Sequence, residues 1–383
     1  MKNESDPAHC IATAAEVCKT LGISRDTLYA YVSRGLLRAA PHPSDRRRSL
    51  YDHRDVEMLR ARKHRGRSRR AVAESTINWG EPILTSKITR IADGHYHYRG
   101  RDAVEFASRA SLEDALALLA EVQPRAPVRL PADWRIPDYR LPFDRVLGML
   151  TAEAVAGRVG DGRPRAAQLL RLAALSAAGQ GGGDHPDRPM HELLARAWSN
   201  RPEAADAIRS ALVLSADHEL NASAYAARVA ASAGASLPAS LLVGVATLSG
   251  NRHGGITARC RDWVMAMAGP NPPDWRQSVT DDPAPPPGFG HPLYPDGDPR
   301  AKALLRLFPE ADTWHAIAAD VQALTGHHPT IDFGLALVEC ELGLPEGAGM
   351  AIFAVGRMAG WTAHIFEQRR TGQIIRPRAA SEE

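Results

Sequence analysis

The sequence has few cysteines and few aromatic residues, and it has no long apolar run. Its four cysteines, Cys10, Cys18, Cys260 and Cys340, lie far apart without a CxxC or Cys/His pair, so neither a disulfide framework nor a zinc site is indicated. No run approaches the roughly 18 consecutive apolar residues of a membrane helix, and the polar start lacks the apolar segment of a signal peptide. We therefore expect a cytoplasmic protein with no bound metal and no membrane partner.

The sequence does have length and an uneven distribution of charge. Its 383 residues are enough for two or three domains with buried cores. Residues 1–70 hold 16 Lys and Arg against 8 Asp and Glu, which leaves 31 against 36 for residues 71–383. A basic head favours a polyanion as partner, because lysine and arginine neutralise phosphates. The alternative is a charged face that only keeps the chain soluble.

The head, residues 1–63, has the pattern of two short helices around a turn. Thr13 and Glu16 form a capping box, Gly22 ends the first helix, and Ser24 caps a second helix that ends at Gly35. This is the layout of a helix-turn-helix, whose second helix enters the major groove of DNA. The second helix and the arginine run after it supply the candidate DNA-binding residues Arg25, Thr27, Tyr29, Arg46, Arg47 and Arg48.

The head resembles the winged helix-turn-helix of the MerR/excisionase type. The resemblance rests on Gly35-Leu36-Leu37, on the arginines at 46–48, and on Tyr51 with Asp55-Val56. It implies DNA binding, although the same shape also serves as a purely structural module or as a dimer or partner contact. We expect a further helix from about Asp52, with Val56 and Leu59 closing a small core. The basic, breaker-rich residues 64–76 are interpreted as a linker.

The rest of the chain is predicted to be helical. Residues 77–100 alternate apolar residues around turn signals, which predicts short extended structure before helices resume near Ala103. Apolar residues then recur at i, i+3 and i+4 among good helix formers in LEDALALLAEV, AAQLLRLAALSAA, MHELLARAW, AADAIRSALVL, AYAARVAASAGA and ASLLVGVATLSG. Several segments are apolar nearly all round, so we expect burial against other helices or a partner subunit. The predicted fold class is all-α behind a winged helix-turn-helix.

Three of the fifteen histidines stand in settings that favour chemistry. His218 follows a nearly apolar helix, with Asp217 and Glu219 as candidate orienting partners. His253 lies among glycines, and His291 lies in a Pro/Gly loop. Glycines allow a ligand to approach closely, and the dipole of a following helix disfavours the charged form of a histidine. A single histidine, however, is more often a surface residue or a satisfied core residue than a catalytic one.

One acid, Asp332, is also a candidate catalytic residue because of its neighbours in the sequence. Asp332 lies in HPTIDFGLALV, where apolar neighbours surround it in the sequence. Desolvation raises the pKa of a carboxyl group, so we expect Asp332 to be poised as a base near neutral pH. On its own, this observation is also compatible with an ordinary buried acid.

Taken together, these segments resemble the citrate synthase family from about Ile77 to Arg378. The family's order is followed by ADGHYHYRG, SADHELNASAYAARVAASAGA, RHGGI, PGFGH with DPRA, PTIDFGLALV, AVGRMAGWTAHIFEQ and RPRA. The resemblance implies a helical homodimer in which each subunit has two domains. The large domain would comprise residues 77–254 and 343–383, and the inserted small domain, residues 255–342, would close over the substrates.

The resemblance also implies a reaction: condensation of acetyl-CoA with oxaloacetate to give citrate and free coenzyme A. The coenzyme A thioester is then a substrate, and no permanently bound cofactor is expected. Asp332 would abstract a methyl proton, His253 would hydrogen-bond the thioester oxygen, and His291 would polarise the ketone. Arginine forks suit carboxylates. By motif position, the residues that would bind the carboxylates of oxaloacetate are Arg300, Arg357, His218 and, from the second subunit, Arg376.

The sequence departs from the family's pattern near the expected coenzyme A site. Where the family commonly shows GHRVYK, this chain has Pro292 and Pro295 in place of two cations that meet phosphates. Ile256-Thr257 and Ala222-Ser223-Ala224 also differ from the usual residues. Two alternatives stay open: a 2-methylcitrate synthase that uses propionyl-CoA, since one methylene is worth only about 1–3 kcal/mol of discrimination, and a transcription regulator that senses a carboxylate or acyl-CoA.

Overall fold

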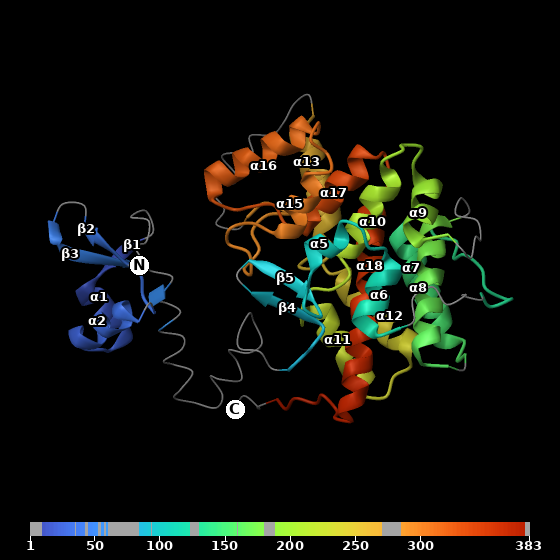
Figure 1. Cartoon of the computed structure of the whole chain (residues 1–383), viewed down its shortest axis with the longest axis horizontal. Helices are drawn as coiled ribbons and strands as arrows, with labels where there is room; N and C mark the ends of the chain where they lie inside the picture. The colour runs from blue at the N-terminus through green and yellow to red at the C-terminus, as the bar shows by residue number, and fades with distance from the viewer. Residues whose placement is uncertain are drawn as a thin grey trace. The chain divides into compact units, whose positions relative to one another are not determined.

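The chain forms two compact units, Met1–Thr85 and Ser86–Glu383 (Figure 1). The computed structural model describes residues 10–34, 36–42, 45–52, 55–56, 59, 84–92, 94–122, 130–158, 160–179, 188–269 and 285–379. The side chains of residues 10, 11, 42 and 45–47 are outside this description. The predicted linker at 64–76 also lies outside the described residues.

The first unit has the two predicted helices, framed by a small antiparallel sheet. In chain order its elements are β1 (Cys10–Thr13), α1 (Ala14–Leu21), α2 (Arg25–Ser33), β2 (Ala39–His42) and β3 (Asp45–Asp52), with sheet order β1-β3-β2. Thr13 and Glu16 form the expected capping box, and Gly22 ends α1 in the left-handed conformation. Ser24 caps α2 by accepting from the Thr27 amide. The helix-turn-helix layout is confirmed.

The core of the first unit is small and is closed by residues that follow β3. Its buried members, with Leu59 packed against them, are Val17, Leu21, Leu28, Leu37, Tyr51 and Val56. Arg38 binds Asp55 through two charge-assisted hydrogen bonds of 2.9 and 3.0 Å, which pins this closing segment to the turn after α2. The prediction of a helix from about Asp52 was early, because Asp52 still belongs to β3 and helical residues are described from Asp55 onward.

The second unit begins with a short antiparallel sheet. Strands β4 (Thr89–Ala92), β5 (His95–Tyr98) and β6 (Arg101–Asp102) are in that order in the sheet. Tyr96 and Tyr98 on β5 are both buried, in keeping with the period of two along a strand. The prediction of extended structure before Ala103 is confirmed over its described part, while residues 77–83 lie outside the description.

Helices make up most of the second unit, as predicted (Figure 1). In chain order they are α5 (Ala103–Ala107), α6 (Leu112–Ala120), α7 (Pro142–Val155), α8 (Arg163–Ala178), α9 (Met190–Trp198), α10 (Ala204–Leu214), α11 (Ala222–Ser232), α12 (Leu237–Leu248), α13 (Ile256–Met267), α15 (Pro299–Leu305), α16 (Asp312–Thr325), α17 (Ile331–Glu341) and α18 (Ala348–Thr371).

Helix α18 is the central element of this unit and packs against α6, α7, α8, α10, α11, α12 and α17. Its residues are buried over most of its length, which is unusual for a helix unless other helices surround it. Two glycines allow the close approach. A side chain at Gly356 would overlap the Leu212 carbonyl, and one at Gly360 would overlap the Asp217 carboxylate. The segment from Leu212 to Asp217 therefore lies directly on α18.

The second unit contains two apolar cores. The larger one is built around α18, while a smaller one joins α13, α16 and α17 through residues that include Cys260, Trp314, Val321 and Phe333. Cys18, Cys260 and Cys340 are free thiols. Over the described part of the chain, no helix is both long enough and apolar enough to cross a membrane.

Candidate active site

The three histidines singled out from the sequence lie in turns that follow or precede helices. His218 follows α10, His253 lies between α12 and α13, and His291 lies in the loop before α15. The rings of His218 and His291 meet edge to face, with centroids 5.2 Å apart. Tyr294 packs beside both, with ring centroids 5.5 Å from His218 and 5.1 Å from His291. Segments about 70 residues apart are thus brought together.

His218 is oriented by a tyrosine instead of an acid. Its Nε2 lies 2.8 Å from the Tyr294 hydroxyl, whereas Asp217 is engaged by Thr89 and His364 and Glu219 is exposed. The expectation that Asp217 or Glu219 orients His218 is therefore wrong. The reason is geometric: residues next to each other in a turn point their side chains in different directions.

His253 contacts the hydroxyl of Ser223, which lies in the first turn of α11. The start of α11 is therefore close to the turn before α13. The Ser223 Oγ lies 2.8 Å from His253 Nε2 and 2.7 Å from Asn221 Oδ1. Trp361 Nε1 donates to the same oxygen at 3.2 Å. Asn221 Oδ1 can only accept, so the Ser223 hydroxyl donates its one proton to Asn221. The proton of a neutral His253 is then on Nε2, and it is on Nδ1 only if the Ser223 hydroxyl turns from Asn221 to His253.

Asp332 occupies the first turn of α17 and accepts hydrogen bonds from two threonines. The Thr257 hydroxyl donates to its Oδ1 at 2.7 Å, and the Thr330 hydroxyl donates to its Oδ2 at 3.3 Å. Burial nevertheless raises the pKa of Asp332 to about 6, against the lowering effect of these bonds and of Arg300. The carboxyl group therefore changes its protonation state close to neutral pH.

The two arginines are fully buried and differ in how they are held. Arg300 Nε and Nη2 donate to the two carboxylate oxygens of Asp298 at 2.9 and 2.8 Å. Arg357 Nε donates to the Ser215 carbonyl at 2.7 Å, and its guanidinium lies over the Phe353 ring. Among the described residues, no hydrogen-bond acceptor meets the Nη atoms of Arg357. A buried guanidinium with unused donors is suited to a carboxylate ligand.

Burial and these two cations keep the histidines neutral. Burial lowers the pKa of His253 and of His291 to about 4, with Arg357 adding to the effect on His253 and Arg300 to that on His291. The pKa of His218 is also far below its ordinary value, mainly through burial and then through Arg300. Neutral imidazoles can donate a hydrogen bond to a carbonyl oxygen without adding charge.

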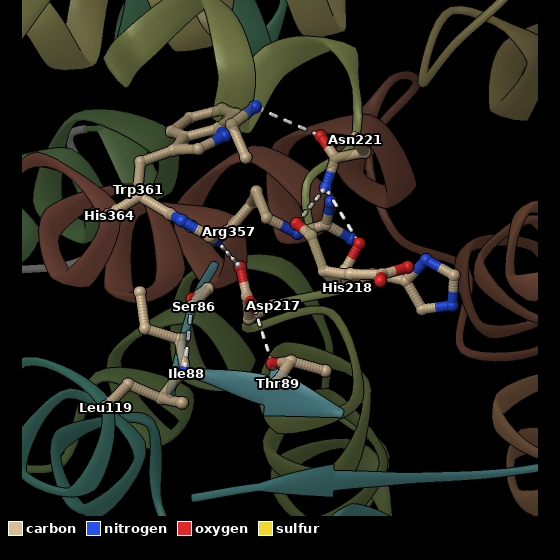
Figure 2. A network of polar contacts seen from close by, with 12 residues as sticks. Ser86, Ile88, Thr89, Leu119, Asp217, His218, Asn221, Arg357, Trp361 and His364 are labelled. Carbon is tan, nitrogen blue, oxygen red and sulfur yellow. Dashed lines mark hydrogen bonds and ion pairs between the residues drawn. The ribbon is translucent and has the colours of Figure 1, made fainter. Parts of the chain in front are cut away.

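The residue before His218, Asp217, is the centre of a buried set of polar contacts (Figure 2). Its Oδ2 accepts from the Thr89 hydroxyl of β4 at 2.5 Å, and its Oδ1 lies 3.3 Å from His364 Nε2 on α18. Burial alone would raise the pKa of Asp217, but His364, Arg357 and Thr89 together hold it below its ordinary value. Asp217 is therefore ionised at neutral pH.

The remaining predicted residues lie elsewhere. Arg376 is exposed in the segment after α18, and the structure gives it no contact with the cluster of histidines. In the first unit, Arg25 and Tyr29 are exposed on α2, while Thr27 is partly buried. The exposed Arg48 lies on β3. The backbone of Arg46 and Arg47 belongs to β3, but their side chains are outside the description.

Several residues of the cluster escaped the sequence analysis as site residues. Some left a local signal: Asp298 is the N-cap of α15 two residues before Arg300, and His364 follows Arg357 by seven residues, which places both on one face of α18. The residues that bind the predicted ones without such a signal are Thr89, Ser223, Thr257, Tyr294 and Thr330. No group of three or more candidate ligands that could hold a metal occurs in the described part of the chain.

Comparison with known proteins agrees with this fold. Residues 155–378, more than half of the chain, match the citrate synthase C-terminal domain family, and residues 13–64 match a helix-turn-helix domain family. The citrate synthase of Haloferax volcanii is 34% identical over 187 residues, which cover 46% of this chain and 49% of the relative. The 2-methylcitrate synthase 2 of Corynebacterium glutamicum is 32% identical over 190 residues, with 47% and 49% covered. The chain spans about half the length of the curated relatives it matches.

Solved structures resemble a larger share of the chain. Citrate synthase from Thermotoga maritima superimposes with a TM-score of 0.67 at 23% identity, covering 79% of this chain and 94% of the other. Citrate synthase from Thermoplasma acidophilum, in a ternary complex with carboxymethyl coenzyme A and oxaloacetate, gives a TM-score of 0.69 at 22% identity, covering 82% and 96%. These likenesses show the fold. With the family match over more than half its length, the chain belongs to the citrate synthase family and has a helix-turn-helix domain ahead of the synthase-like unit.

Proposed function

We propose that this chain condenses acetyl-CoA with oxaloacetate to form citrate and free coenzyme A. The observation that carries the proposal is the pairing of one carboxyl group whose pKa burial raises to about 6 with histidines that burial keeps neutral. A base that works near neutral pH and neutral hydrogen-bond donors are what enol formation from a thioester requires. The solved Thermoplasma acidophilum relative was crystallised with oxaloacetate and a coenzyme A derivative, which supports the choice of substrates.

In this proposal, Asp332 takes a proton from the methyl group of the thioester, and His253 donates a hydrogen bond to the thioester oxygen. For His253 to donate from Nδ1, the Ser223 hydroxyl must turn from Asn221 Oδ1, 2.7 Å away, to His253 Nε2, 2.8 Å away. His291 donates to the ketone of oxaloacetate, so that the enol carbon attacks the polarised carbonyl. Water then cleaves the citryl thioester, which releases coenzyme A. No permanently bound cofactor enters this scheme.

The carboxylates of oxaloacetate are assigned to the buried cations. Arg357 offers both Nη groups, since its Nε is already used by Ser215. Arg300 offers the edge that Asp298 leaves unused, and His218 adds a hydrogen bond. Arg376 is assigned to the site of a second subunit in a homodimer. We also propose that residues 255–342, which contain the smaller apolar core, form the small domain, and that residues 77–254 with 343–383 form the large one.

The direct test is release of free coenzyme A thiol by the purified chain given oxaloacetate with either acetyl-CoA or propionyl-CoA. Faster turnover of acetyl-CoA that vanishes in Asp332→Asn supports the proposal. Preference for propionyl-CoA would instead make the protein a 2-methylcitrate synthase, as some relatives are named. Absence of turnover with both donors, in folded protein that still binds oxaloacetate, would contradict the proposed activity. Because Pro292 and Pro295 stand where the family commonly has two cations that meet phosphates, the affinity for coenzyme A should be measured separately.

The helix-turn-helix unit favours a second function, in which the chain binds DNA in the cytoplasm and regulates transcription in response to a carboxylate or acyl-CoA. The exposed Arg25 and Tyr29 on α2 and Arg48 on β3 support a DNA-facing surface. A ligand alters DNA affinity only if it binds two arrangements of the protein differently. Titration of duplex DNA with and without oxaloacetate therefore decides whether the two activities are coupled.

A further inference from the structure

Asp217 is the centre of a buried network that the proposed reaction does not use. It lies in the turn between α10 and α11, and it is fully buried. Thr89 from β4 and His364 from α18 contact opposite oxygens of its carboxylate, at 2.5 and 3.3 Å (Figure 2). A buried carboxylate is costly unless it is paired and hydrogen-bonded. The desolvation cost of burying this carboxylate indicates that its contacts have a role in the turn.

The proton on His364 can be placed from its other neighbour. Arg228 Nη1 lies 3.1 Å from His364 Nδ1, and a guanidinium can only donate. His364 Nδ1 therefore accepts, and a proton on Nε2 faces Asp217. Arg228 is held in turn by Glu367 at 2.7 Å and Gln368 at 3.1 Å. The network thus ends at the contact between His364 Nε2 and Asp217 Oδ1, which lie 3.3 Å apart without the geometry of a hydrogen bond.

The turn that contains Asp217 also contains two contacts of the proposed dicarboxylate site. The Ser215 carbonyl accepts from Arg357 Nε at 2.7 Å, and His218 is the next residue after Asp217. The turn is further held from β5, because the Asp217 amide donates to the Tyr98 hydroxyl at 3.2 Å. A displacement of Asp217 would therefore move the backbone that orients Arg357 and the imidazole of His218 together.

Charge complements this geometry. Burial lowers the pKa of the Arg357 guanidinium, which is about 10 with all neighbours included, and Asp217 is the neighbour that most opposes this lowering. Arg300, the other buried guanidinium, acts on Arg357 in the repulsive direction and has Asp298 as its own partner. Each of the two cations thus has one buried carboxylate that compensates its charge.

We propose that Asp217 is a positioning residue for the dicarboxylate site: fixed by Thr89 and His364, it sets the turn from Ser215 to His218 and compensates the charge of Arg357. The proposal rests on the proposed function for the identity of the ligand. It differs from a purely structural role because it concerns one substrate. Loss of the carboxylate charge or of its anchor weakens oxaloacetate binding while the acyl-CoA side of the reaction is little affected.

The experiment compares four variants of the full chain. Asp217→Asn removes the charge with little change in shape. Thr89→Val removes the hydroxyl that donates to Asp217, and Thr89→Ser keeps it. The matched control is Glu153→Gln, which makes the same change at a buried carboxylate that binds Arg165 away from the site. For each protein, KM for oxaloacetate, KM for acetyl-CoA, kcat and the thermal midpoint are measured, together with the Kd of oxaloacetate alone by calorimetry.

In Asp217→Asn we expect KM and Kd for oxaloacetate to rise by about tenfold or more, and KM for acetyl-CoA by less than about twofold. Thr89→Val should shift in the same direction by a smaller factor, and Thr89→Ser should resemble the wild type. Equal changes in both KM values, or changes that follow the thermal midpoint as in Glu153→Gln, would overturn the proposal.

The calorimetric measurement separates this proposal from the proposed function. A wild type that binds oxaloacetate without turning over would overturn the condensation activity alone, because the Kd series still tests Asp217. A wild type that binds no oxaloacetate would overturn both. An unchanged Kd in Asp217→Asn beside an active wild type would overturn only the positioning role.

Discussion

Thr257 donates a hydrogen bond to Asp332 across 2.7 Å, from the first turn of α13 to the first turn of α17. The bond opposes the effect of burial, which raises the pKa of Asp332 to about 6. A hydroxyl on α13 thus lowers the pKa of an acid on α17. A base with a pKa close to the working pH combines a useful ionised fraction with useful proton affinity, so this contact is a natural point at which to test the mechanism.

Replacing Thr257 by valine should move the acidic limb of the pH profile to higher pH. The bond stabilises the ionised carboxylate, so its loss raises the pKa of Asp332 further above about 6, by roughly one unit or less. The pH dependence of kcat/KM measures this. His253 and His291, whose pKa values are about 4, do not titrate in this range. The control is Thr151→Val, which loses a hydroxyl bonded only to its own helix and should leave the acidic limb of the pH profile unchanged. If the acidic limb is also unchanged in Thr257→Val, Asp332 is not the group that causes it.

Asp332→Asn should make the protein more stable while it abolishes turnover. Because the pKa of Asp332 is about 6 in the folded chain against an ordinary 3.8, the folded state holds this proton more tightly than the unfolded state. The stabilisation that follows is full below the unfolded pKa and is lost as the pH rises through the folded pKa. Asparagine avoids that loss and still accepts the bond from Thr257, so at about pH 8 the gain is at most about 2–3 kcal/mol. Denaturant unfolding at about pH 8 and about pH 4 measures it, and equal gains at both pH values would contradict the assigned cause.

Gly360→Ala should damage the site by steric overlap. A Cβ at Gly360 would overlap both the Asp217 carboxylate and the Ala216 carbonyl, and overpacking of this kind costs about 1–3 kcal/mol or more. We expect a lower thermal midpoint and a higher KM for oxaloacetate. Gly148→Ala is the matched control, since it is also inside a helix but meets the ring of the exposed Tyr139, which can move away. If Gly148→Ala lowers stability as much as Gly360→Ala does, the close contact with Asp217 is not the cause.

Alanine at Arg46, Arg47 and Arg48 together should weaken DNA binding by the first unit and flatten its salt dependence. Removing one arginine–phosphate interaction reduces the slope of log affinity against log salt by about 0.9, so the slope should fall by up to about three. Fluorescence anisotropy with duplex DNA over a range of salt concentrations measures the slope. Alanine at the exposed Arg101 and Arg135 of the second unit serves as the control for the reduced positive charge. A slope that the triple variant leaves unchanged would exclude these arginines from the interface.

The features predicted correctly from the sequence are those with local signals. The capping box of Thr13 and Glu16, the glycine that ends α1 and the apolar periodicity of the helices all depend on residues a few positions apart. The raised pKa expected for Asp332 followed from its apolar neighbours in α17, and the structure gives the same direction. The resemblance to the citrate synthase family is confirmed by the family match over residues 155–378.

The partners of the site residues could not be predicted, because they are set by packing between distant segments. His218 meets Tyr294 from 76 positions away, and Asp217 meets Thr89 from 128 positions away. Both contacts start from the turn after α10, which lies against α18 at Gly360. A pattern of residue types shows neither which neighbour in a turn faces inward nor which distant hydroxyl meets it. For this reason the sequence analysis paired Asp217 with His218, whereas in the structure Asp217 contacts His364.

The start of the second unit is tied to its interior within a few residues of the boundary. The Lys87 amide donates to Glu367 at 3.0 Å, and Thr89 donates to Asp217 at 2.5 Å. A dissected protein without the head must therefore begin no later than Ser86 to keep both hydrogen bonds. A cut placed after Thr89 would leave the Asp217 carboxylate buried without its hydroxyl partner. The permissible fusion point between a helix-turn-helix domain and this synthase-like unit is thus defined by two hydrogen bonds, and any exchange of the head for another domain has to keep them.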